Sequence, residues 1–91
     1  MRIRWTPAAA ADLEQIHNYL IERMPGFAHS TIVRIYSSVQ SLKRMPNKGR
    51  LGREAGTREL VLVPLPYIVV YRVREDEIAI VHVHHGARER S

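Results

Sequence analysis

Two arginines and a histidine are the residues of this chain best suited to chemistry on a phosphodiester. Arg58 lies at the start of one apolar run, and His85 and Arg88 lie at the end of the last one. A histidine, whose ordinary pKa is about 6.5, can act as general acid or base, and arginine can stabilise phosphate charge. These are parts of a metal-free ribonuclease that uses the RNA 2′-hydroxyl as nucleophile. The alternative is that Arg58 pairs with Asp12 or Glu59 and supports the fold, and that the tyrosines of the strands belong half to the core.

Two tyrosines and two histidines are candidates for binding rather than cutting. Tyr67 and Tyr71 share one apolar run and could stack on bases. His82 and His84 alternate along a predicted strand, so both side chains point to the same face. Two imidazoles on one face could ligate a metal, but no carboxylate or cysteine ligand stands at an obvious third position. We therefore expect contact with a partner, and neither a metal nor another cofactor.

A cluster of basic residues precedes the apolar runs. Between Lys43 and Arg58 the chain has six basic residues and one acid, and the net charge of the whole chain is +5. Such a cluster attracts RNA, DNA or an acidic protein segment. The alternative is a solvated loop that keeps the protein soluble. The candidate binding residues from this cluster are Lys48, Arg50, Arg53 and Arg58.

Three runs rich in β-branched residues must position these side chains. Two lie within residues 56–73, on either side of a Pro-x-Pro break, and the third extends from Ile78 to His85. Runs this close in sequence predict three antiparallel strands in a meander. A two-residue hairpin loop at Glu75-Asp76 predicts the pairs Tyr67–His84, Val69–His82, Tyr71–Ile80 and Val73–Ile78.

Alternation along these strands gives the predicted sheet two different faces. One is nearly all aliphatic near its middle and is expected to pack on the helices; it carries Ile68, Val70, Val81 and Val83. The other is expected to be partly exposed as a surface for a partner, and it carries Tyr67, Tyr71, His82 and His84.

The N-terminal half predicts a strand and a helical hairpin. Residues 2–5 alternate polar and apolar, and Thr6 and Pro7 suit the N-cap and first position of a helix. Pro25-Gly26 is expected to end that helix, and a second should extend from about Phe27 to Arg44. The short break implies an antiparallel pair. The buried stripes should be Ala9, Leu13, Ile16 and Leu20, and then Ala28, Ile32, Ile35, Val39 and Leu42.

Length and composition set the remaining bounds. We expect one domain over residues 1–91, with residues 46–56 as a loop without regular structure, because this stretch holds three glycines and a proline. Cysteine is absent, which excludes disulfides and thiolate-bound zinc. No apolar run is long enough to span a membrane, so we expect a soluble cytoplasmic protein with no membrane partner. The predicted fold class is α+β: a strand, a helical hairpin, and a three-stranded antiparallel meander that the first strand joins.

Five motifs, in order along nearly the whole chain, resemble the RelE/ParE superfamily of type II toxins, and the ParE branch more closely. Two precede the predicted sheet and three lie within it. They are Trp5-Thr6-Pro7-Ala8-x3-Asp12-Leu13-x2-Ile16-x2-Tyr19, Pro46-x2-Gly49-Arg50, Gly56-Thr57-Arg58-Glu59-Leu60, Pro66-Tyr67-Ile68-Val69-Val70-Tyr71-Arg72-Val73 and Val83-x-His85-Gly86-Ala87-Arg88.

The resemblance implies the toxin of a toxin–antitoxin pair, in a hetero-oligomer with an antitoxin whose C-terminal segment wraps it. RelE-type toxins cut messenger RNA on the ribosome, whereas ParE-type toxins poison DNA gyrase and lack the nuclease residues. Arg58 looks like the arginine that begins the second strand of RelE-type proteins, and Arg88 stands in for a C-terminal one. Because no tyrosine or lysine follows Arg88, we favour gyrase inhibition over an enzymatic role. The alternatives are ribosome-dependent mRNA cleavage, an inactive toxin, or a stand-alone nucleic-acid-binding module.

Overall fold

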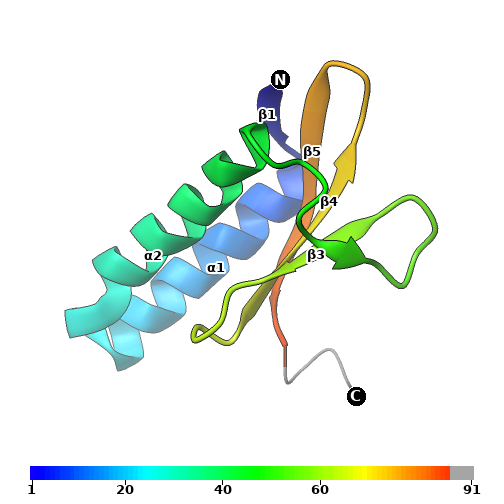
Figure 1. The fold of residues 1–91 in the computed structure, drawn as a ribbon. Helices are drawn as coiled ribbons and strands as arrows, with labels where there is room; N and C mark the ends of the chain where they lie inside the picture. The colour runs from blue at the N-terminus through cyan, green and yellow to red at the C-terminus, as the bar shows by residue number, and fades with distance from the viewer. Residues whose placement is uncertain (87–91) are drawn as a thin grey trace.

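A computed structural model describes residues 1–86 of the chain, and Arg88 lies outside them. Two helices cover one face of a five-stranded sheet, so the predicted α+β class is confirmed (Figure 1). The strand order is β1-β5-β4-β3-β2. The elements are β1 (Arg2–Trp5), α1 (Pro7–Arg23), α2 (Pro25–Gln40), the 3-10 turn η1 (Ser41–Lys43), β2 (Arg50–Leu51), β3 (Arg58–Val61), β4 (Tyr67–Val73) and β5 (Glu77–His85).

The two helices begin where the sequence chemistry favours a helix. The Thr6 hydroxyl accepts a hydrogen bond from the Ala9 N–H at 3.2 Å, with Pro7 in the first helical position, as predicted. The second helix begins at Pro25 rather than Phe27, because proline also fits a first helical turn. It ends at Gln40, before η1, rather than at Arg44. Both predicted apolar stripes are buried or half-buried in the core.

The β4–β5 hairpin has the predicted loop but a shifted register beyond its middle. The Arg74 N–H donates to the Glu77 carbonyl at 2.8 Å, and Tyr71 pairs with Ile80 as predicted. A β-bulge then leaves Val81 as an extra residue, because Val70 already pairs with His82. The predicted pairs Tyr67–His84 and Val69–His82 are therefore wrong, since Tyr67 pairs with His85 and Val69 with Val83.

The predicted assignment of the sheet faces is also wrong. On β4 the buried side chains are Tyr67, Val69 and Tyr71, with 6%, 0% and 0% of their surface exposed, whereas Ile68 and Val70 are only half-buried. Two causes combine. The bulge reverses the alternation along β5, so that Ile78, Ile80 and Val83 all join the core. The tyrosines pack inward as large apolar bodies.

The loop between η1 and β3 contains a regular element that the sequence analysis excluded. Arg50 pairs with Glu59 and Leu51 with Arg58, which makes β2 a short edge strand. The Gly52 N–H then donates to the Thr57 carbonyl at 2.8 Å. The glycines lie outside these paired residues, so their number did not prevent a short strand from forming.

Parallel pairing of β1 with β5 places a carboxylate between two arginines. Arg2 and Arg4 flank Glu77, with nitrogen–oxygen distances of 3.3 and 2.9 Å, and Glu77 is only 7% exposed. The hydrogen bond from Arg4 is the main reason that the pKa of Glu77 lies below its ordinary value. A carboxyl whose pKa is lowered by folding stabilises the protein above its unfolded pKa and loses that effect as the pH falls through its folded pKa.

We predict that Glu77→Gln flattens the acid limb of the stability profile. Between about pH 5 and about pH 3 the free energy of unfolding should fall more steeply in the parent chain than in the variant, because Glu77 takes up a proton in the unfolded chain at a higher pH than in the folded one, and glutamine does not titrate. Urea denaturation at a series of pH values measures this. Glu75→Gln, in the exposed hairpin loop, is the matched control and should follow the parent. Parallel profiles for the parent chain and Glu77→Gln would contradict the prediction.

Candidate functional site

Arg58 is committed to backbone atoms of the preceding loop. One of its terminal nitrogens, Nη1, donates to the Asn47 carbonyl at 3.2 Å and to the Gly49 carbonyl at 2.7 Å. Asp12 and Glu59 are the structural partners predicted from the sequence, and Arg58 bonds to neither. The predicted cation of a nuclease site is instead half-buried beside the segment 46–49, which we name the Pro46–Gly49 turn.

Tyr71 holds the same turn from the core side. Its phenol donates to the Pro46 carbonyl at 2.7 Å and accepts from the Gly49 N–H at 2.9 Å. A Cβ at Gly49 would lie 2.7 Å from that phenol oxygen, so the close approach requires glycine. With no exposed surface, Tyr71 is not available to stack on a base or a partner in this structure.

The basic cluster is partly neutralised by an acid just outside the stretch used to define it. Two Arg50 nitrogens donate to Glu59 at 3.1 and 2.9 Å, and the Arg53 N–H lies 3.4 Å from the same carboxylate. Partial burial acts to raise the pKa of Glu59, but these hydrogen bonds outweigh it and hold the pKa below its ordinary value. The Lys48 ammonium group donates to a neutral group, the Ser41 hydroxyl at 3.0 Å, and no ion pair compensates its charge within the described residues.

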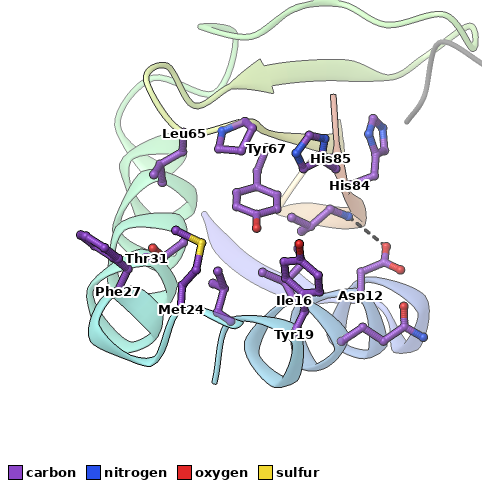
Figure 2. A pocket seen from close by; sticks show the side chains of 14 residues that line it. Asp12, Ile16, Tyr19, Met24, Phe27, Thr31, Leu65, Tyr67, His84 and His85 are labelled. Atoms are coloured by element: carbon purple, nitrogen blue, oxygen red, sulfur yellow. Dashed lines mark hydrogen bonds between the residues drawn. The ribbon is translucent and has the colours of Figure 1, made fainter. Parts of the chain in front are cut away.

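Asp12 joins α1 to the edge of β5 where β1 has ended. One oxygen of its carboxylate accepts from the Val83 N–H at 3.0 Å and lies 3.0 Å from the His82 Nδ1 (Figure 2 draws the bond to Val83). β1 pairs with β5 only as far as Ile80, so the carboxylate takes the place of a further strand residue. This role of Asp12 was not predicted, because nothing near it in the sequence indicates which strand edge it meets.

An open groove of about 900 Å³ lies between the helical hairpin, the start of β4 and the end of β5 (Figure 2). Tyr19, Met24 and Phe27 line it although 44%, 46% and 61% of their surface is exposed. Its other lining residues include apolar Ile16, Leu20 and Leu65 and polar Asp12, His84 and His85. The sequence shows apolar residues at the junction of the two predicted helices, but it does not show that they are exposed, so it did not indicate this groove.

The structure keeps two of the predicted nuclease residues, Arg58 and His85, apart, and the third, Arg88, lies outside the described residues. Arg58 pairs with Tyr71 at one end of β4, while His85 pairs with Tyr67 at the other. These positions are about 13 Å apart along the strand, at about 3.3 Å per residue. His85 instead lies against the Tyr67 ring, with ring centroids 5.7 Å apart, and lines the groove.

Other kinds of site receive no support within residues 1–86. His82 contacts Asp12, and across this described part of the chain no three His, Asp or Glu side chains gather as metal ligands would. Within the same residues, neither helix is long and apolar enough to cross a bilayer.

We predict that Asp12→Ala destabilises the fold by about 1–2 kcal/mol, because a partly buried N–H at a strand edge loses its acceptor. Asp12→Asn should cost less, since an amide oxygen can still accept from Val83. Urea denaturation at neutral pH provides the measurement, and Glu14→Ala, on an exposed position of α1, is the matched control. If Asp12→Ala and Glu14→Ala unfold alike, the carboxylate does not stabilise the strand edge.

Comparison with known proteins gives consistent matches over most of the chain. The family model for the ParE toxin of the type II toxin–antitoxin system parDE matches residues 3–90. Y4kP of Sinorhizobium fredii is 40% identical over 85 residues, which are 91% of this chain and 88% of that protein. Toxin RelE2 of Caulobacter vibrioides is 38% identical over 87 residues, or 96% of this chain and 97% of the relative.

Solved structures show the same fold. A chain from the chromosomal ParDE TA system of P. aeruginosa superimposes with a TM-score of 0.86 at 31% identity, over 93% of this chain and 95% of that one. A chain of the YoeB dimer from Staphylococcus aureus gives a TM-score of 0.61 at 15% identity, with the same two coverages of 93% and 95%. At that identity the second match supports the fold alone.

Proposed function

This chain belongs to the ParE toxin family of type II toxin–antitoxin systems, and on that premise we propose that it arrests growth by inhibiting DNA gyrase. The observation that carries the choice of target is the commitment of Arg58 to the Pro46–Gly49 turn. Its guanidinium already donates to two carbonyls, so it is poorly placed to stabilise a cleaved phosphodiester.

A ribonuclease needs its catalytic groups closer together than the described residues place them. Its base, acid and charge stabiliser must all come within about 3 Å of the reacting atoms. Arg58 and His85 lie toward opposite ends of β4, and Tyr71 is buried. A protein that inhibits by binding needs only an accessible surface of suitable charge and shape, which the cluster around Lys48 and Arg53 supplies.

Ribosome-dependent mRNA cleavage is the second candidate, because one relative at 38% identity is named Toxin RelE2. The two functions predict different products from one preparation. Purified chain should inhibit the supercoiling of relaxed plasmid by gyrase and leave messenger RNA intact on translating ribosomes. Adding the antitoxin should restore supercoiling, which excludes a contaminant as the inhibitor.

Codon-positioned cleavage of messenger RNA that is lost in His85→Ala or Arg88→Ala would overturn this proposal and make those residues catalytic. A stand-alone nucleic-acid-binding module would give a third pattern. The isolated chain would then bind RNA or duplex DNA tightly, and lose about tenfold or more in affinity over a few-fold rise in salt.

We further propose that the groove between the helices and the sheet receives an amphipathic segment of the antitoxin. Membership of a toxin–antitoxin family supplies the partner class, and the exposed Tyr19, Met24 and Phe27 supply an apolar surface for it. The chain's net charge of +5 favours an acidic partner. The proposed complex is therefore a hetero-oligomer of toxin and antitoxin.

We predict that Phe27→Glu weakens antitoxin binding by about ten- to a hundredfold, which corresponds to the 1.5–3 kcal/mol gained by burying a large apolar side chain. Isothermal titration with the protein encoded by the neighbouring reading frame measures this. Val33→Glu is the matched control, because Val33 is 47% exposed on the same helix and does not line the groove. Equal losses in the two variants would mean that the groove is not the binding surface.

A further inference from the structure

We infer that Tyr71 and Arg58 are positioning residues that fix the Pro46–Gly49 turn so that Lys48 is presented to an anionic group on the toxin's target. This inference rests on the proposed function, in which the basic cluster contacts the target. It gives Arg58 a role different from that of a catalytic cation, and it gives a buried tyrosine a part in recognition.

Hydrogen bonds from different elements converge on this turn. The phenol of Tyr71 in β4 bonds to the backbone of Pro46 and Gly49, and the Arg58 guanidinium in β3 bonds to Asn47 and Gly49. The Lys48 N–H also donates to the Met45 carbonyl at 3.2 Å. Thus the backbone on both sides of Lys48 is held by side chains that belong to the sheet.

Lys48 is the cation of the Pro46–Gly49 turn itself, and its charge is not compensated within the described residues. Arg50 is paired with Glu59, and Arg72 donates to the Ala55 carbonyl and lies 3.6 Å from Glu54. Lys48 is exposed, and its ammonium group donates to the neutral Ser41 hydroxyl. An ordered backbone lowers the entropy lost when such a side chain binds, which is the general advantage of a preorganised contact.

The turn is also well separated from the groove. Residues at the start of α2, such as Phe27, line the groove, whereas the turn follows the other end of that helix (Figure 1). The 16 residues of α2 span about 24 Å at about 1.5 Å per residue. An antitoxin segment in the groove and a target at Lys48 would therefore occupy different surfaces.

The experiment removes the Tyr71 hydroxyl without changing any surface group. In Tyr71→Phe, hydrogen exchange followed by NMR should show at least a tenfold loss of protection at the Gly49 amide. The inducer level needed for half-maximal growth arrest in bacteria without antitoxin should rise at least fivefold at equal soluble protein. Tyr36→Phe, on an exposed tyrosine of α2, should change neither quantity.

Non-additivity separates positioning from general loss of stability. Lys48→Ala should reduce growth arrest, and adding Tyr71→Phe to it should cause little further loss, because both changes remove the same contact. Three results would each overturn the inference: losses that multiply in the double variant, full potency of Tyr71→Phe, or full potency of Lys48→Ala. Because growth arrest is measured directly, a parent chain that arrests growth without inhibiting gyrase would contradict only the proposed target.

Discussion

The phenol of Tyr71 is a polar group placed in the middle of an apolar core, and the surrounding structure must satisfy it. An unpaired buried hydroxyl is costly, so backbone groups have to reach it. The Pro46 carbonyl and the Gly49 N–H do so, which brings the chain after η1 back against the sheet. Because the chain lies against the sheet here, Arg50 is beside Glu59 and β2 can form. The position of the basic cluster thus follows from the need to satisfy one buried oxygen.

Local chemistry was enough to predict most of the elements. Thr6 and Pro7 mark a helix start, the four-and-three spacing of apolar residues marks the buried stripes, and Glu75-Asp76 marks a hairpin loop. Each signal depends only on residues close together in sequence. The start of α2 was misplaced because Pro25 can both end one helix and begin another.

The sheet faces and the site depended on contacts between distant residues. Nothing in the β5 sequence indicates that Val81 forms a bulge, yet that one residue decides which side chains at the end of β5 face the helices and how they pair with β4. Likewise, Arg58 could be identified as a candidate cation, but its acceptors are backbone carbonyls of a loop whose path is set by Tyr71. Predicting the groove would have required the distance between the helices and the sheet, which no sequence pattern gives.

The parallel pairing of β1 with β5 has a consequence for synthesis of the protein. β1 leaves the ribosome before every other element of the described chain, but its hydrogen-bonding partner is the last of them, β5. Closing so long a loop is entropically costly and is characteristic of slower folding. Until β5 emerges, the edge of β1 therefore stays unpaired, and the apolar faces of α1 and α2 are not covered by the complete sheet. A chain of this topology can complete its sheet only after β5 has been synthesised, and an antitoxin has that interval in which to be present first.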